Sequence, residues 1–393
     1  MTDLSAAADL PVSTCRAHRI IEVTDAAELA CHVPAWERLV EQAAEPNVFY
    51  APWALLPAAH HLRGGQKLRV LLFLRNGEED LLDGMLPLFE RACGGLVASL
   101  HSYQHRYCFS AEPLLQLGRE GEVARSFAAW LQQRRFRYPL LSLRGLDSEG
   151  VWLRELGCAL GERGLRYQRS APVQRALLRL NVGLETFLQR TPAKKYREYH
   201  RLQERLAELG ELRVQVLRPD ADAGELQAWL DAFIALELKG WKGREGTALG
   251  SRLECRRFFE ETAHGAHARG LLVMMRMSLD GRPVAMLCDF LAPPGRYAFK
   301  TAYDEDHARF APGVLLEIEN ARQTFADSRG VEWLDSCAAP DNALLNRLYP
   351  DRRTLSDLTA CTQGLAWAGL QLSAGLKRLW QRRRSQAEAQ STD

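Results

Sequence analysis

Two charged residues interrupt apolar stretches in the second half of the sequence. Asp289 lies within the stretch 282–292, and Lys300 lies within the stretch 296–303. Burying a charged group is costly unless it is paired, so we expect Asp289 and Lys300 to face each other across adjacent strands. Such a pair could be purely structural, or one or both residues could line a cleft in which an acceptor group loses its proton.

Three further residues suited to proton transfer lie at the ends of expected strands. Asp304 and Asp335 could orient or deprotonate a nucleophile, and Tyr303 could donate a proton. An aspartate at the end of a strand is also a common turn residue, so both interpretations stay open for Asp304 and Asp335. The candidate catalytic residues are Lys300, Tyr303, Asp335, Asp304 and Asp289.

A helix is expected to begin shortly after Tyr303. Pro312 suits the first turn of a helix, and Gly313 leaves that turn uncovered by a β-carbon. Free N–H groups and the positive end of the helix dipole would then face outward, as a pyrophosphate requires. The alternative is a helix start that binds nothing. The candidate cofactor-binding residues are Arg309, Pro312, Gly313, Val314 and Leu315.

Signatures of several other protein classes are absent from the sequence. It contains no GxxxxGK[ST], GxGxxG, GxSxG, HExxH or CxxC motif, which disfavours ATPases, dinucleotide-dependent enzymes and serine hydrolases. The nine cysteines are scattered singly, which argues against a disulfide framework or a zinc ribbon. His101 and His105 lie in an aromatic segment that favours packing over metal binding. We therefore expect no metal site.

An alternation of strands and helices must position the candidate residues. Asp280-Gly281 separates the apolar stretches 270–279 and 282–292, which predicts a hairpin, and the stretch 296–303 supplies a third consecutive strand. In the first half, Asn76-Gly77 predicts a second hairpin by the same turn chemistry. The sequence therefore predicts an α+β fold with a mixed, largely antiparallel sheet in each half, flanked by helices.

Length and composition are those of a folded globular protein. The 393 residues are 47% hydrophobic and 25% charged, and this length suggests two domains. The second half repeats the strand and helix pattern of the first, and the final 30 residues differ from both. The expected units are a flexible leader at 1–18, one module at 19–170, a second module at 171–362, and a basic amphipathic helix with a tail at 363–393.

Charge and targeting patterns limit the possible partners. The formal net charge of +2 predicts no general attraction to nucleic acid, and no DNA partner is expected. Six cations between Arg190 and Leu206 form either a solvated helix face or a contact for phosphates or a polyanionic saccharide.

The final helix either packs on the domain or lies on a membrane surface with Trp380 as its anchor. Without a signal peptide or an apolar span, we expect a cytoplasmic protein, with peripheral attachment to the inner membrane as the second interpretation of that helix.

Short motifs follow one another in an order that resembles a known family. They are Trp241-Lys242-Gly243 with Gly246-Thr247-Ala248, Asp280-Gly281-Arg282-Pro283, the segments 299–305, 312–316 and 334–337, and Asn346-Arg347. In this order they resemble the FemAB-like branch of the GNAT superfamily. The resemblance is specifically to acetyltransferases of the CelD/BcsL type (BioF2-like acetyltransferase domain family), which accompany bacterial cellulose and exopolysaccharide genes. It is densest over about 236–353, and the first half adds plainer matches at 47–53 and 113–115.

This resemblance implies two tandem GNAT-like modules, of which the second holds the site. It implies transfer of an acyl group from acetyl-CoA or another acyl-CoA to an amine or hydroxyl acceptor, a small molecule or a saccharide. The matched motifs make Trp241, Lys242, Asn346 and Arg347 candidate substrate-binding residues. A membrane-associated polysaccharide synthase is the partner that such a role implies.

The sequence departs from the family at one motif. The usual pyrophosphate loop, [QR]-x-x-G-x-[GA], is replaced by the segment 309–314, which holds a single glycine. Two alternatives therefore stay open beside the acyl-CoA enzyme. One is an aminoacyltransferase of the FemAB type that takes its acyl group from tRNA, and the other is a non-catalytic scaffold of a polysaccharide synthase.

Overall fold

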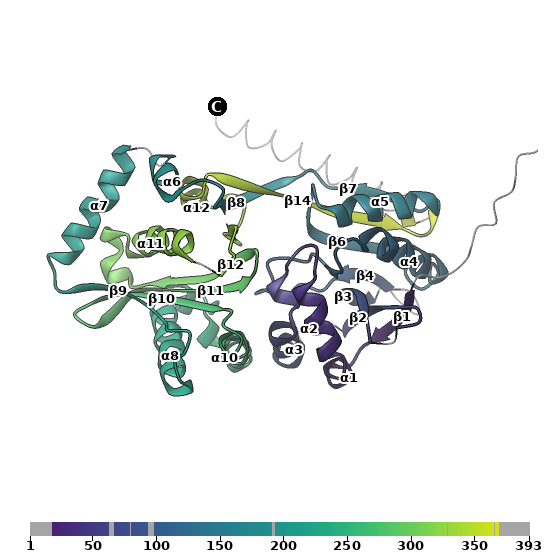
Figure 1. Cartoon of the computed structure of the whole chain (residues 1–393), viewed down its shortest axis with the longest axis horizontal. Coiled ribbons are helices and arrows are strands. Elements are labelled where there is room, and N and C mark those ends of the chain that lie inside the picture. The colour runs from purple at the N-terminus through teal and green to yellow at the C-terminus, as the bar shows by residue number, and fades with distance from the viewer. Residues whose placement is uncertain are drawn as a thin grey trace, which may run out of the picture.

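The chain forms two α/β modules that lie side by side and share one continuous sheet (Figure 1). The computed structural model describes residues 18–62, 67–78, 80–92, 98–190, 193–327, 329–364 and 366–368. The expected leader, apart from His18, and the C-terminal tail from 369 onward lie outside these residues. In the described part, no helix combines the length and the hydropathy that a membrane span requires.

The first module is a sheet with helices on both faces. One face is covered by the helices α1 (Ala26–Ala30), α2 (Val33–Glu41) and α3 (Pro52–His61), and the other by α4 (Glu120–Gln133) and α5 (Val151–Glu162). The strands are β1 (His18–Val23), β2 (Lys67–Arg75), β3 (Leu82–Ala92), β4 (Ala98–Ser102), β5 (Leu114–Leu115), β6 (Leu140–Asp147) and β7 (Arg166–Arg169), and a short 3-10 helix, η1, spans Val48–Tyr50.

The second module repeats this arrangement. Helices α8 (Ala223–Lys239) and α10 (Leu253–His267) cover one face of its sheet, and α11 (Pro312–Ala326) covers the other. Its strands are β8 (Val173–Arg179), β9 (Leu212–Val216), β10 (Leu272–Leu279), β11 (Arg282–Ala292), β12 (Gly295–Tyr303), β13 (Trp333–Asp335) and β14 (Asp351–Cys361). Shorter or peripheral helices are α6 (Leu184–Arg190), α7 (Ala193–Ala207), α9 (Trp241–Arg244), α12 (Ala343–Leu348), η2 (Leu249–Ser251) and η3 (Glu305–Phe310).

Both predicted hairpins are confirmed. Asp280 and Gly281 have φ values of 49° and 77°, the left-handed conformation that a two-residue hairpin turn needs at both central positions. They join β10 to β11, and β12 completes the predicted antiparallel meander. Gly77 has a φ of 86° between β2 and β3. In each case local turn chemistry is sufficient to fix the pairing of neighbouring strands.

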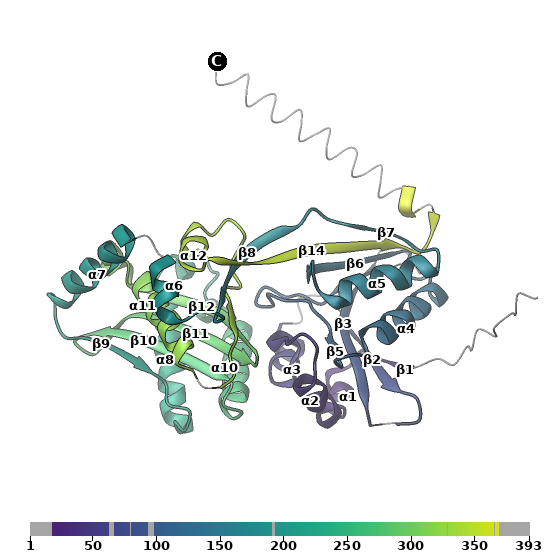
Figure 2. The ribbon, with the colours of Figure 1, turned by 45° about the horizontal axis from the view of Figure 1, so that its top comes forward.

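Strand β14 joins the two sheets into one. Its first half pairs with β8, and its second half pairs with β6 and β7, so it runs across the junction between the modules (Figure 2). The expected boundary at 170/171 falls between β7 and β8. The strand that closes the second half of the chain therefore also completes the sheet of the first module, which the sequence did not predict.

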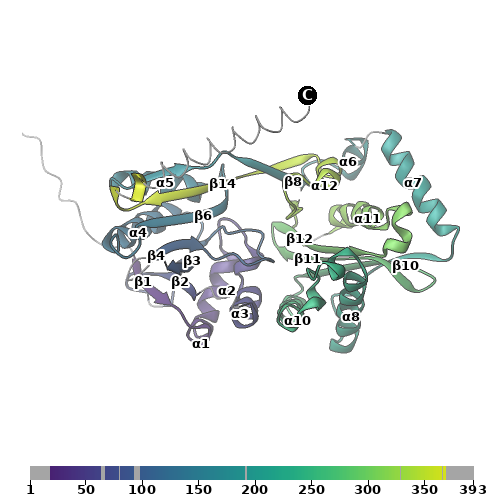
Figure 3. The ribbon, with the colours of Figure 1, turned by 180° about the vertical axis from the view of Figure 1, so that it is seen from behind.

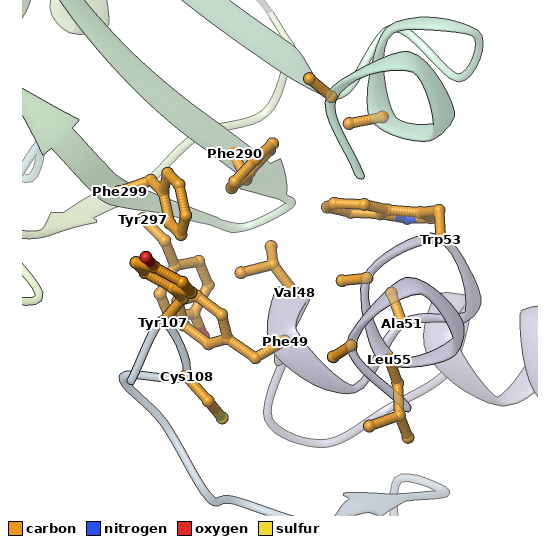
Figure 4. Close-up of a cluster of buried hydrophobic side chains, with 14 of the residues drawn as sticks. Val48, Phe49, Ala51, Trp53, Leu55, Tyr107, Cys108, Phe290, Tyr297 and Phe299 are labelled. Atoms are coloured by element: carbon orange, nitrogen blue, oxygen red, sulfur yellow. The ribbon is translucent and has the colours of Figure 1, made fainter. Parts of the chain in front are cut away.

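The two modules also share a hydrophobic core. Phe49 lies 5.7 Å from Tyr297 and Trp53 lies 5.3 Å from Phe290, measured between ring centroids, and Figure 4 shows these side chains meeting across the junction. Helices α3 and α10 lie side by side (Figures 1 and 3). At Gly265 on α10, an added β-carbon would come within 2.8 Å of the Trp53 side chain. The junction is therefore packed as closely as a domain interior.

We expect Trp53→Ala to lower the free energy of unfolding by about 3–5 kcal/mol, because it removes a large side chain from the shared core. Calorimetry of the variant should still show one transition for both modules. The matched control is Leu117→Ala, whose side chain is 70% exposed and whose loss should change stability by about 0.5 kcal/mol or less. Two separate transitions in the Trp53→Ala variant, one unchanged from the wild type, would contradict the shared core.

Candidate functional site

The edge of strand β12 that faces β13 is open over most of its length. β13 pairs with β12 only from Gly295 to Tyr297, whereas β12 continues to Tyr303. On this open edge the Thr301 carbonyl accepts a hydrogen bond of 2.8 Å from Lys242 Nζ. The N–H and C=O of one strand residue point the same way, so the Thr301 N–H also points to the open edge.

A cavity of about 740 Å³ lies along this open edge. Its walls come from β12, the start of α11, the segment 336–345 after β13, and the α9 region at 241–247. The first module contributes Arg106, Tyr107 and Phe109, from the segment between β4 and β5. The cavity is therefore built by both modules.

The cavity reaches both faces of the sheet, since consecutive residues of β12 point to opposite faces. Lys300 Nζ donates to Glu237 Oε1 of α8 at 2.5 Å. Thr301 Oγ1 donates to Glu317 Oε1 of α11 at 2.6 Å. One side of the cavity is thus the α8 face of the sheet and the other is the α11 face, and they meet at the open edge of β12.

Lys300 lies on the α8 face, close to one acid and two other cations. Burial lowers its pKa, the carboxylate of Glu237 acts in the opposite direction, and the nearby cations Lys242 and Arg106 lower it further. Glu237 is 2% exposed, accepts a bond of 2.7 Å from the Leu249 N–H, and lies 3.4 Å from Lys242 Nζ. A lysine with a lowered pKa can lose its proton more readily than a solvated one, which suits a general base.

Glu317 is the ionisable group at the α11 face of the cavity. It is 5% exposed, and its carboxylate accepts hydrogen bonds from Thr301, from Tyr349 at 3.1 Å and from Asn320 at 3.5 Å. Burial raises the pKa of Glu317, and the charge of Asp289 adds to this effect. Because all its oxygens have partners, Glu317 holds Thr301 and α11 in place.

The predicted helix start is confirmed, because α11 begins at Pro312, and it lies beside the cavity. Gly313 and Val314 line it, whereas Leu315 is buried in the core beneath. The Val314 and Leu315 N–H groups both donate to the Ala311 carbonyl, at 2.9 and 3.1 Å, and Pro312 has no N–H. Within the described residues, Gly313 is thus the first-turn residue whose N–H makes no intramolecular bond. Arg309 stacks on the ring of Phe310 at 4.7 Å and does not line the cavity.

The expected pairing of Asp289 with Lys300 is wrong. Lys300 lies opposite Cys288, and an irregularity in the register follows, so that Asp289 lies opposite Ala298. Asp289 consequently points to the α11 face, where Arg296 Nε donates to it at 2.9 Å. Arg296 is 1% exposed and also donates to Thr324 and Asn320. The pair Asp289–Arg296 fixes α11 on the sheet.

The other two candidate aspartates make ion pairs and do not line the cavity. Asp335 is fully buried, accepts from Arg175 Nη2 at 2.7 Å and lies 3.5 Å from Arg353 Nη1. Its other oxygen accepts from the N–H of Cys337, which has a φ of 50°. Asp304 caps η3 and pairs with Lys239 at 2.7 Å. Both arrangements fit the turn interpretation of a strand-end aspartate.

Of the five remaining candidate residues, three line the cavity and two do not. Tyr303, Trp241 and Lys242 line the cavity. Asn346 donates to the carbonyl of Pro340 at 2.7 Å, and Arg347 is exposed, and neither lines the cavity. Residues that sequence analysis missed include Arg106, Tyr107, Glu237, Thr301, Glu317 and Asn342. A signal existed for Glu237, because it continues the apolar stripe of α8 formed by Leu230, Phe233 and Ile234.

Residues 193–342 match the family model of the acetyltransferase (GNAT) domain. Over this segment the second module is similar to that family. The matched segment runs from α7 to the residue before α12, and so includes β12, α11 and most of the cavity walls. A search of curated proteins gives no significant match to the sequence.

Solved structures extend the likeness of fold beyond the GNAT domain to both modules. A conserved protein of unknown function from Bacteroides thetaiotaomicron is 12% identical, with a TM-score of 0.53 over 84% of this chain and 97% of that chain. FemX is 9% identical, with a TM-score of 0.51 over 87% of this chain and 96% of that chain. At these identities the comparison concerns the fold, which agrees with the predicted mixed sheets flanked by helices.

We expect Asp335→Asn to lower the free energy of unfolding by about 3–5 kcal/mol, because it leaves the buried Arg175 without its counter-charge. Chemical denaturation measures this loss. The matched control is Asp304→Asn, whose partner Lys239 is largely exposed and whose side chain can still cap η3, so a loss of about 1 kcal/mol or less is expected. If Asp335→Asn were as stable as the wild type, the structural assignment of Asp335 would be wrong.

Proposed function

We propose that the protein is an acyl-CoA-dependent acyltransferase that moves its acyl group directly to an amine or hydroxyl acceptor. The observation that carries this proposal is the open edge of β12 inside a cavity that reaches both faces of the sheet. A donor on one face and an acceptor on the other would meet at this edge. The match of residues 193–342 to the GNAT domain supports the same reaction class.

The α11 face suits the donor. Gly313, at the N-terminus of α11, lines the cavity and has an unbonded N–H. Together with the positive end of the helix dipole, such a group favours the pyrophosphate of CoA. From there the thioester would extend along the open edge of β12. The Thr301 N–H would then donate to the oxyanion that forms when the acceptor attacks the thioester carbonyl.

Two cavity residues would carry out the proton transfers. Neutral Lys300, on the α8 face, would take the proton from the acceptor as its nitrogen or oxygen bonds to the acyl carbon. As the carbon–sulfur bond breaks, Tyr303 would donate a proton to the thiolate of CoA. Tyr303 is suited to this because its ring lies 3.4 Å from the point where a Gly313 β-carbon would stand, on the α11 face.

The identity of the acyl group, the pathway of the acceptor and the location of the enzyme are proposed from the family resemblance. The resemblance of 236–353 to CelD/BcsL-type enzymes supports an acetyl group as the acyl group and an acceptor in bacterial envelope, cellulose or exopolysaccharide biosynthesis. It also supports action on the cytoplasmic side of the inner membrane, beside a membrane-associated polysaccharide synthase.

A second donor is favoured by one observation. The start of α11 offers one free N–H, from Gly313, because Val314 and Leu315 bond to Ala311. A glycine-rich loop would offer several, so this is a sparse site for a pyrophosphate. An aminoacyl-tRNA, whose phosphates would bind elsewhere, is the corresponding alternative donor.

We expect acetyl-CoA to bind saturably in a calorimetric titration, and Gly313→Trp to weaken that binding at least about tenfold, or ~1.4 kcal/mol. The indole would fill the space between α11 and Tyr303. The matched control is Gly161→Trp, on α5 of the first module, where an added β-carbon meets no atom within 4 Å and binding should be unchanged. If the folded wild type bound neither acetyl-CoA nor CoA, the CoA proposal would fail and aminoacyl-tRNA would become the donor to test.

We expect the rate of acyl transfer to rise with pH through the pKa of Lys300, because only the neutral amine accepts a proton. Lys300→Met should lower kcat by about 10²–10⁴-fold. Glu237 raises the pKa of Lys300, so Glu237→Gln should move the rising limb of the pH–rate profile to lower pH. The control is Glu261→Gln. Glu261 lies on α10 and contacts His61, so its substitution should not move the rising limb of the profile. A limb that does not move in Glu237→Gln would exclude Lys300 as the base.

A further inference from the structure

The two faces of the cavity differ in charge. On the α8 face lie the cations Arg106, Lys242 and Lys300, and the acid in contact with them is Glu237. Glu237 pairs with both lysines, so one positive charge remains on them. Arg106 is exposed, and it makes no ion pair with any described residue. The α8 face thus has an excess of two positive charges when Lys300 is protonated. When Lys300 is neutral, as the proposed base must be, one excess charge remains, that of Arg106.

The α11 face lacks such an excess. Its charged lining residue is Glu317, whose carboxylate is already bonded to Thr301, Tyr349 and Asn320. The other residues that line this face carry no charge, as at Val314, Asn342 and Leu345. The cationic excess is therefore confined to the side from which the acceptor would approach.

Arg106 is held in position by the shared core. The next residue, Tyr107, is 2% exposed and stacks on Phe258 of α10 with ring centroids 5.5 Å apart. The Arg106 guanidinium lies 5.4 Å from the centroid of the same Tyr107 ring. A cation on a fixed segment loses little conformational entropy when it binds an anion. The first module therefore places an unpaired charge at the site of the second.

We propose that the acceptor carries a carboxylate or phosphate, which Arg106 and Lys242 bind on the α8 face. This rests on the proposed function, and it assigns the first module the selection of the acceptor. Lys242 also bonds to the Thr301 carbonyl, so an anion bound to it lies beside the point of acyl transfer. A cationic acceptor without an anionic group is repelled by the same charges, which is how the site discriminates between acceptors.

The test compares acceptors that differ in their anionic group. Glycerol is paired with glycerol phosphate, and glycinamide with glycine, so that phosphate and carboxylate are tested separately. Binding to the full-length protein is measured by calorimetric titration at low and raised salt. We expect at least one anionic member to bind ten or more times tighter than its partner, and the difference to shrink as salt rises.

Substitutions of Arg106 test whether this residue causes the preference for the anionic acceptor. Arg106→Ala should remove most of that tenfold preference, Arg106→Lys should keep part of it, and the binding of CoA should not change in either. The matched control is Arg257→Ala, an exposed arginine of α10 outside the cavity lining, which should leave the preference intact. Equal binding within both pairs, or an unchanged preference in Arg106→Ala, would overturn the proposal. So would a loss of CoA binding in Arg106→Ala, since the cations would then serve the donor.

The test of the anion site and the test of the proposed function can fail independently of each other. The titrations with anionic probes need no turnover, and the CoA titration with Gly313→Trp needs no acceptor. Anion preference without CoA binding would refute the CoA-dependent function and leave the anion site. CoA binding without anion preference would refute the anion site and leave the acyltransferase.

Discussion

The packing between the two modules is the constraint on which the site depends. Phe49 and Trp53 of the first module pack against Tyr297 and Phe290 of the second, and β14 ties both sheets together. Because Arg106 and Tyr107 belong to the first module while β12 belongs to the second, the cavity exists only when this junction is formed. A change at the junction would therefore alter the site without touching a cavity residue.

Buried ion pairs hold the open edge of β12 in its geometry. Asp289 and Arg296 attach β11 and β12 to α11, while Asp335 with Arg175 ties β13 to β8. Charges buried to this degree contribute more when further hydrogen bonds satisfy their remaining polar atoms. Here Asn320 and Thr324 complete the first pair. These pairs hold β13 and α11 in place. The pairing of β13 with β12 ends at Tyr297, which leaves the rest of that edge open to the cavity.

The alternation of side chains along one strand separates the functions in the proposed mechanism. Lys300 faces α8, where the cations gather, and Thr301 and Tyr303 face α11, where the helix dipole is directed. Donor and acceptor chemistry can thus be selected independently on opposite faces of the sheet. They meet only at the open edge, where the Thr301 N–H points.

The sequence by itself determined the features that depend on neighbouring residues. Turn chemistry at Asp280-Gly281 was sufficient for the meander, and Pro312-Gly313 was sufficient for the start of α11. It also placed Lys300 and Tyr303 on the strand that lines the site. Charged residues in apolar strands were correctly expected to be paired.

Only the tertiary structure decided which groups pair and which face the cavity. A single irregularity in the register of β11 and β12 turned Asp289 away from Lys300, since a shift of one residue exchanges the two faces of a strand. Glu237, the actual partner of Lys300, lies 63 residues away in sequence, and Arg106 lies in the other module. Contacts between such distant residues depend on how helices and modules pack, and no local pattern of residue types specifies that packing.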